Sequence, residues 1–294
     1  MGIFFRNYDK PGPGVDPDAP RKRSFFRFFD IFFRKLSHFS RANLLYSVTL
    51  IPTYIIAFFV VSFIMFNTVS EILGMQDGTD FIVIVLSVIF TNFYISVMGA
   101  GPATAGMTYI MRNFAREDHA WIGSDFKDNV KSNFKQSIIV FVIDIVVTVV
   151  IFYAIYIYGQ MSGAISYLKY FLYVISFIYM MMHMYIYPIM VTFKLSIKDI
   201  YRNSFIFALG KLPSNFLVIV ALFFIHIVIP ILILYYGGKF FAIMLIIYLI
   251  AEIVIIMSLT QFLVNFNVYP KIKTYMLDVI EEKNKKRDTD SDAE

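Results

Sequence analysis

The sequence of 294 residues contains no cysteine and little charge, since only 16% of its residues are Asp, Glu, Lys or Arg. Without cysteine there is no disulfide framework, no thiolate metal site and no cysteine nucleophile. An ordinary soluble domain has about 25% charged residues, so this chain has too little charge to cover a soluble surface of its size. The composition therefore excludes a disordered chain and a soluble enzyme of the usual kind.

Apolar residues are abundant instead: 59% of the chain is hydrophobic, with 33 Phe and 20 Tyr. A helix needs about 20 apolar residues to cross a bilayer, and lipid offers no partner for an unpaired backbone group, so such stretches must be helical. We expect an all-α polytopic membrane protein with six transmembrane helices. The six stretches are 44–66, 81–101, 137–158, 165–187, 216–236 and 240–264.

Basic residues are sorted along the chain in a way that predicts orientation. Of the 26 Lys and Arg residues, 24 lie before the first stretch, after the last, or in the two connections 102–136 and 188–215. Because loops with an excess of Lys and Arg stay in the cytoplasm, both termini are expected to be cytoplasmic.

A repeat is superimposed on these stretches. An asparagine precedes each odd stretch and a proline follows each even one, at separations of 59, 55 and 55 residues. We interpret this as three tandem helical hairpins at about 43–102, 133–188 and 215–270. The alternative is that Asn and Pro simply favour helix ends.

The repeat singles out three residues, each 11 positions after its asparagine: Tyr54, Asp144 and His226. At 1.5 Å per residue this position is about 16 Å deep, near the midplane. Ionisable residues inside a membrane are functional candidates. Our hypothesis is that the three meet on a pseudo-threefold axis and form a substrate or ion pathway, with Asp144 paired to His226 and Tyr54 donating its hydroxyl. The alternative is that they only hold the bundle together.

Glu252 is a fourth pathway candidate, either paired with Lys169 or facing a water-filled cavity, whereas His183 is expected near the interface. The Gly-rich segment 99–106 precedes Pro102 and is interpreted as close helix contact, not as a phosphate loop. Because no catalytic or metal-binding motif is present, we expect no catalytic residue, no metal, no cofactor and no enzymatic activity. Nucleic-acid binding is not expected either.

The flanking segments divide the chain into three regions: an arm at 1–43, a membrane domain at 44–270 and a charged tail at 271–294, expected to be disordered after 283. Residues 24–39 predict an amphipathic helix lying in the interface, and 103–117 and 189–209 predict lateral helices beneath the bundle. The remaining arm has a non-helical stretch, either flexible or an extended peptide bound by another protein. This stretch comprises Lys10, Pro11, Gly12, Pro13 and Gly14.

Several motifs resemble those of the YesL family of bacterial membrane proteins. They are Tyr8-Asp9 followed by the Lys10–Gly14 stretch, and the segments 23–29, 43–46, 101–106, 112–117, 119–120, 124–126 and 191–193. The family is described as one of unknown function, whose genes often lie beside those of carbohydrate ABC importers. The resemblance implies the bacterial cytoplasmic membrane and an accessory or regulatory role in sugar uptake. It supplies no catalytic residue.

Two functions follow as hypotheses. In the first, the protein is a non-enzymatic accessory subunit that lies in the bilayer and binds carbohydrate ABC transporter subunits through its arm and lateral helices, including Arg112 and Arg116. In the second, it is itself a transporter or channel that uses the pathway residues. The sequence does not indicate an oligomeric state.

Overall fold

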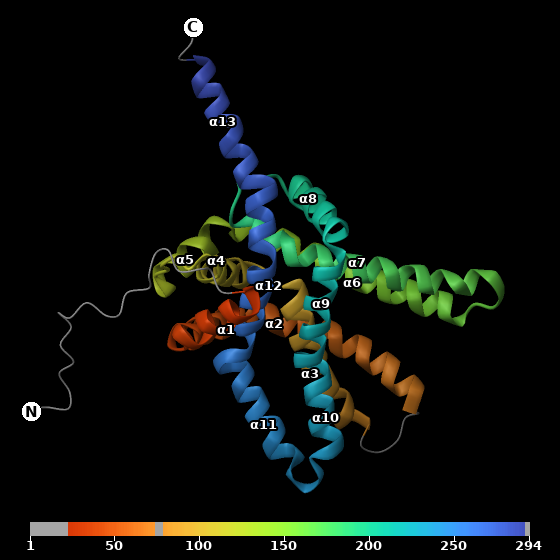
Figure 1. Ribbon diagram of the computed structural model, residues 1–294. Coiled ribbons are helices and arrows are strands. Elements are labelled where there is room, and N and C mark those ends of the chain that lie inside the picture. Colours follow the sequence, from red (N-terminus) through yellow and green to blue (C-terminus); the bar gives the residue numbers. More distant parts are fainter. Residues whose placement is uncertain (1–22, 74–78, 292–294) are drawn as a thin grey trace, which may run out of the picture.

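The computed structural model describes residues 23–73 and 79–291, in which every regular element is a helix (Figure 1). Six helices are long and apolar enough to cross a membrane, which confirms the predicted all-α polytopic membrane fold. The candidate spans are Leu36–Thr68, Phe81–Met98, Phe134–Gln160, Gly163–Met190, Leu212–Tyr236 and Gly238–Lys285. Of the predicted arm, the Lys10–Gly14 stretch lies outside the described residues.

The described residues include thirteen α-helices and three π-helical turns, which are labelled η2, η4 and η5. In chain order these are α1 (Ser24–Arg34), α2 (Leu36–Leu73), α3 (Thr79–Met98), α4 (Pro102–Arg116), α5 (Ile122–Ser132), α6 (Phe134–Gln160), α7 (Leu168–Met190), α8 (Ile197–Gly210), α9 (Leu212–Phe223), η2 (Phe224–Val228), α10 (Ile229–Tyr236), α11 (Phe241–Ala251), η4 (Glu252–Ile256), α12 (Met257–Ile272), η5 (Lys273–Leu277) and α13 (Asp278–Ser291).

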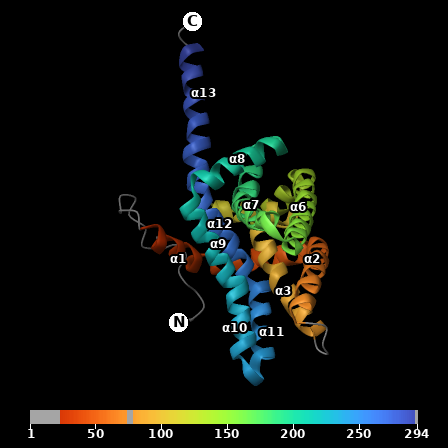
Figure 2. The same ribbon diagram turned by 90° about the vertical axis from the view of Figure 1, so that its right-hand side faces the viewer.

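The long helices form three consecutive hairpins: α2 with α3, α6 with α7, and α9–α10 with α11–α12. Their tips diverge from a common core, so that each hairpin extends in its own direction in both views (Figures 1 and 2). The end of the molecule where the hairpins start, formed by α4, α5 and α8, is called the basic end here. The predicted region boundaries at 43 and 270 fall inside continuous helices and stay a prediction.

Helix α4 lies at the centre of this core rather than beside it. Thirteen of its fifteen residues are buried, against α12 and α5 among others. Gly99 and Gly101 make the turn between α3 and α4 with φ of 78° and 71°, a conformation that a side chain disfavours. Pro102 then starts α4 at a position where its missing N–H costs nothing. The predicted helix at 103–117 therefore forms, but as a core element.

Helix α1 packs on the core through one side only. Phe28 stacks on Phe262 at 4.9 Å between ring centroids, and Ile31 is fully buried. Phe25 and Phe33, which the predicted apolar face also included, are 68% and 66% exposed. The helix thus has a second aromatic face that is exposed among the described residues.

The charged tail differs from the prediction. Helix α13 continues α12 and η5 up to Ser291, where disorder was expected after residue 283. Glu and Lys are good helix formers, and an existing helix needs no new nucleus to be extended.

Candidate functional site

Two pairs of ionisable side chains are buried within the membrane-spanning helices. His226 on η2 faces Glu252 on η4, and Asp144 on α6 faces His183 on α7. All four residues are at most 3% exposed. Charged groups at such positions are stable only when they are paired. Each pair therefore stabilises the fold, and it is also a candidate functional site because ionisable residues inside a membrane are rare.

The His226–Glu252 pair is held by hydrogen bonds from three helices. His226 Nδ1 lies 2.8 Å from Glu252 Oε1, and His226 Nε2 lies 2.7 Å from the Ser96 hydroxyl on α3. Tyr248 donates its hydroxyl to Glu252 and also lies within 2.9 Å of the Ile225 carbonyl. The single phenolic proton of Tyr248 thus has two possible acceptors, the Glu252 carboxyl group and the Ile225 carbonyl. Tyr248 can donate to Glu252 when this residue is ionised, and to the Ile225 carbonyl when Glu252 is protonated.

Both members of this pair lie on π-helical turns, which are frequently found at functional sites. Pro230 explains the first turn, because it has no N–H to donate to the His226 carbonyl and its ring clashes with that group. The second turn is stabilised by Asn43 on α2, whose Nδ2 donates to the Glu252 carbonyl at 2.7 Å and whose Oδ1 accepts from Ser258 N at 2.5 Å. The sequence thus widens the helices at the two positions that carry the pair.

Glu252 also lines a cavity of about 350 Å³ between α2, α3 and η4. Tyr54 and Asn92 line the same cavity, and the Tyr54 hydroxyl lies 3.4 Å from Asn92 Oδ1. Among the described residues, Glu252 Oε2 has no hydrogen-bond partner. A residue that lines this cavity therefore has a buried carboxylate oxygen without a partner among the described residues.

The second pair uses the other side of α3. His183 Nε2 lies 3.0 Å from Asp144 Oδ1, and the same oxygen accepts from the Tyr179 hydroxyl at 2.8 Å and from the Tyr201 hydroxyl at 3.4 Å. His183 Nδ1 lies 3.0 Å from the Met98 carbonyl. Burial raises the pKa of the Tyr201 phenol on α8, and the Asp144 carboxylate raises it further, so this phenol stays protonated and donates.

A proton count follows from the Met98 contact. A carbonyl oxygen only accepts, so Nδ1 of His183 carries a proton. The single remaining proton lies either on His183 Nε2, beside an Asp144 carboxylate, or on Asp144, beside a neutral imidazole. The pair is neutral overall in both forms, as its burial requires.

The structure corrects the predicted partners. Asp144 does not pair with His226, Glu252 does not pair with Lys169, and His183 is buried rather than interfacial. The reason is that the two helices of one hairpin are in contact, whereas the hairpins diverge (Figure 1). The residue 11 positions after each asparagine accordingly meets the second helix of its own hairpin, in the pairs Tyr54–Asn92, Asp144–His183 and His226–Glu252.

Sequence reasoning missed the tyrosines that complete both pairs. Tyr179 precedes His183 by four residues, and Tyr248 precedes Glu252 by four. Residues four apart share one face of a helix. A tyrosine four residues before an ionisable residue therefore predicts that the two side chains are neighbours, and this spacing occurs in both the fourth and the sixth span.

Arg112 and Arg116, predicted to bind a partner, have different surroundings. Arg112 is 7% exposed and donates to the Val191 carbonyl at 3.0 Å and to the Thr192 hydroxyl at 2.8 Å, just beyond the end of α7. Burial lowers the pKa of the Arg112 guanidinium, and the Arg116 charge lowers it further. A cation at a helix C-terminus is stabilised by the helix dipole. This burial does not fit a role for Arg112 in partner binding, whereas Arg116 is partly exposed and pairs with Asp118 at 2.7 Å.

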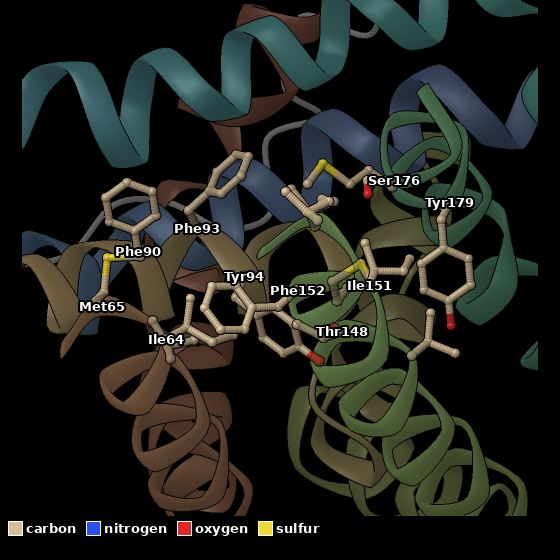
Figure 3. Close-up of a pocket in the computed structure, with 16 residues that line it drawn as sticks. Ile64, Met65, Phe90, Phe93, Tyr94, Thr148, Ile151, Phe152, Ser176 and Tyr179 are labelled. Carbon is tan, nitrogen blue, oxygen red and sulfur yellow. The ribbon is translucent and has the colours of Figure 1, made fainter. Parts of the chain in front are cut away.

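A further cavity of about 310 Å³ lies between the first two hairpins (Figure 3). Its lining surface is almost entirely apolar, with Phe90, Phe93 and Phe152 among the rings. The residues with a polar group in the lining are Tyr94, Thr148, Ser176 and Tyr179. Such a cavity fits hydrocarbon and not a polar solute. Within the described part of the chain, no group of three or more His, Asp or Glu residues is arranged to hold a metal ion.

Comparison with known proteins gave one match. Residues 81–155, about a quarter of the chain, match the family model described as "Protein of unknown function, DUF624". This segment runs from the start of α3 into α6 and includes Ser96, Arg112 and Asp144. No curated protein and no solved structure matches the chain.

Proposed function

We propose that the protein is a non-enzymatic accessory or regulatory protein of the bacterial cytoplasmic membrane that associates with an ABC transporter for carbohydrate uptake. The DUF624 match supports this proposal because YesL proteins are members of that family, and the YesL-like motifs extend along most of the chain. The basic residues favour an orientation with both termini in the cytoplasm.

One structural observation carries the proposal: exposed aromatic side chains gather on the helices at and beside the basic end. Phe25 and Phe33 on α1 and Trp121 before α5 are 66% to 69% exposed. Aromatic residues are enriched in protein interfaces, where a few of them supply most of the binding energy. We place the transporter contact on α1 and Trp121, with Arg116 at its edge. The Lys10–Gly14 stretch, which lies outside the described residues, is proposed as a further contact from the sequence alone.

The cavities favour an accessory role over direct sugar handling. A carbohydrate site needs several convergent hydrogen-bonding groups. The 310 Å³ cavity is almost wholly apolar, and the 350 Å³ cavity offers Ser47, Tyr54, Asn92 and Glu252 among apolar residues. In this proposal the sugar is therefore bound and moved by the transporter and not by this chain.

The test is purification of the full-length protein from its native membranes with identification of bound proteins. We expect ABC transporter subunits to co-purify with the natural protein, and to be reduced at least severalfold by Trp121→Ala and by deletion of residues 1–22. Tyr235→Ala is the matched control, because this aromatic is 78% exposed at a hairpin tip. Absence of transporter subunits from the natural protein contradicts the proposal.

A second candidate function is transport by the chain itself. It is favoured by Glu252, an ionisable residue that lines the 350 Å³ cavity together with Tyr54. Purified protein reconstituted in vesicles should then move a solute, and Glu252→Gln should reduce that movement. If these vesicles take up sugars and Glu252→Gln leaves that uptake unchanged, Glu252 has only a structural role in the helix bundle.

A further inference from the structure

The 310 Å³ cavity lies between the first two hairpins and within the membrane-spanning part of the chain. Its lining residues come from α2, α3, α6 and α7, and all of them fall within the candidate spans (Figure 3). Each of them is buried or half-buried, so the cavity is a recess between helices. Next to the lining, Phe63 on α2 and Tyr153 on α6 connect the two hairpins, with ring centroids 6.3 Å apart. A molecule in the cavity would therefore contact both hairpins.

The hydroxyl groups of the lining residues do not make this cavity a site for water. Ser176 donates to the Leu172 carbonyl at 2.8 Å, and Tyr179 donates to Asp144 Oδ1 at 2.8 Å. Both protons are thus used within the protein. A buried water needs about two to four polar partners, whereas most of this lining consists of Phe, Ile, Val and Met side chains. The cavity is therefore suited to hydrocarbon.

The size of the cavity matches a segment of an acyl chain. An apolar cavity of about 150 Å³ binds benzene, so a volume of about 310 Å³ has room for about twice the six carbon atoms of that ring. The spans are surrounded by the hydrocarbon core of the bilayer, which is about 30 Å thick. Lipid chains are thus the apolar molecules that are present at the depth of the cavity. An empty cavity would deprive its lining of van der Waals contacts, which a chain supplies.

We propose that this cavity binds one acyl chain of a membrane phospholipid, which packs between the first two hairpins as a structural part of the bundle. The chain fills the space that the two hairpins leave where they diverge, and it contacts α2 and α3 on one side and α6 and α7 on the other. Binding depends on the hydrocarbon and not on the headgroup. This lipid site goes beyond the accessory function and does not depend on it.

The first experiment measures the lipid that stays with the full-length protein during purification in digitonin, a detergent with a rigid steroid skeleton in place of an acyl chain. Mass spectrometry of the extracted lipid should find phospholipid at a ratio near one per protein molecule. Val147→Trp fills the cavity from α6 and should lower this ratio severalfold. Ile64→Trp, which fills the same cavity from α2, should have the same effect.

Val150→Trp is the matched control. Val150 lies on the same helix as Val147 but is 60% exposed on the outside of the bundle. The same substitution there adds an equal volume without entering the cavity, so this variant should retain phospholipid at the ratio of the natural protein.

The second experiment separates the chain from the headgroup. Protein stripped of lipid receives either dioleoylphosphatidylglycerol or dihexanoylphosphatidylglycerol, which share a headgroup and differ in chain length. The long-chain lipid should raise the Tm by at least about 3 °C, because a ligand that binds only the folded state stabilises it. The short-chain lipid should leave the Tm unchanged, and Val147→Trp should respond to neither lipid.

Three results overturn the proposal. They are a natural protein without bound phospholipid, equal retention by Val147→Trp and Val150→Trp, and an equal rise in Tm with both lipids, which would indicate a headgroup site. A dimer without bound lipid that Val147→Trp and Ile64→Trp both convert to monomers assigns the cavity to a second copy of the chain instead. None of these results bears on co-purification with a transporter, so the two proposals fail independently.

Discussion

Asn43 on α2 is hydrogen-bonded to the π turn that begins at Glu252, 209 residues away in sequence. Its amide donates to the Glu252 carbonyl at 2.7 Å, and its carbonyl accepts from Ser258 N at 2.5 Å. A π turn leaves backbone groups without the partners that an α-helix would supply, and this one side chain satisfies two of them. Asn43 thereby fixes where Glu252 points and joins the first hairpin to the third.

Asn43→Ala should lower the free energy of unfolding by about 2–4 kcal/mol, because it leaves a buried C=O and a buried N–H unsatisfied at about 1–3 kcal/mol each. Asn133→Ala is the control, since Asn133 begins the second hairpin and, among the described residues, its side chain bonds only to Asn129 and Ser132. It should change stability by less than about 1 kcal/mol. Denaturant unfolding in mixed micelles measures the free energy of unfolding of both variants. Equal losses would contradict a stabilising role of the Asn43 side chain at the π turn.

Double-mutant cycles test the partners of the buried pairs. Asp144→Asn and His183→Gln change two groups in contact, so their effects on unfolding should be coupled by about 1–3 kcal/mol. Asp144→Asn and His226→Gln change groups that share no hydrogen bond among the described residues, so their effects should add to within about 0.5 kcal/mol. Strong coupling between Asp144→Asn and His226→Gln would contradict this arrangement of partners.

The sequence predicted the spans well because span length is a local property of the chain. It placed their ends less well: α2 begins at Leu36 rather than at 44, because Phe39 and Ala42 before the apolar run are fully buried in the core. The inward position of Tyr54, Asp144 and His226 also followed from a local repeat.

The partners of these residues could not be predicted in the same way. Which ionisable group meets which depends on how far the hairpins diverge, and that is decided by packing at the basic end. Asn43, Asn133 and Asn215 occupy equivalent positions in the repeat, yet their side chains have different kinds of partner. Asn43 contacts the Glu252 carbonyl and Asn215 accepts from the Tyr185 hydroxyl, both in another hairpin, whereas Asn133 bonds to Asn129 and Ser132. The sequence pattern around the three asparagines does not predict this difference.

Gly99 and Gly159 provide a contrast between a required and a dispensable glycine. Gly99 has φ of 78°, and a Cβ there would lie 2.5 Å from Tyr187 Cε2. Gly99→Ala should therefore destabilise the fold by at least about 2 kcal/mol, through backbone strain of roughly 1–2 kcal/mol and displacement of Tyr187. The Tyr187 hydroxyl accepts from Gly101 N at 3.0 Å, so that contact is disturbed as well.

Gly159→Ala should be neutral or stabilising by up to about 1 kcal/mol, because it lies in helix α6 with nothing within 4 Å of an added Cβ. Thermal denaturation of the detergent-solubilised protein separates the two variants. A Gly99→Ala protein as stable as Gly159→Ala would show that the α3–α4 turn tolerates a side chain.

Arg112→Lys should weaken the isolated protein even with no partner present. Arg112 Nη1 donates to both the Val191 carbonyl and the Thr192 hydroxyl, and Nη2 donates to Asn113 Oδ1. A lysine has a single nitrogen in place of this fork and cannot keep all three contacts. We expect a loss of about 1–3 kcal/mol in unfolding free energy. Arg116→Lys is the control, because Arg116 is partly exposed in a surface ion pair with Asp118 and such pairs contribute little. If Arg112→Lys leaves stability unchanged but abolishes co-purification with a transporter, Arg112 contacts the partner after all, and its place beside the end of α7 belongs to the unbound protein alone.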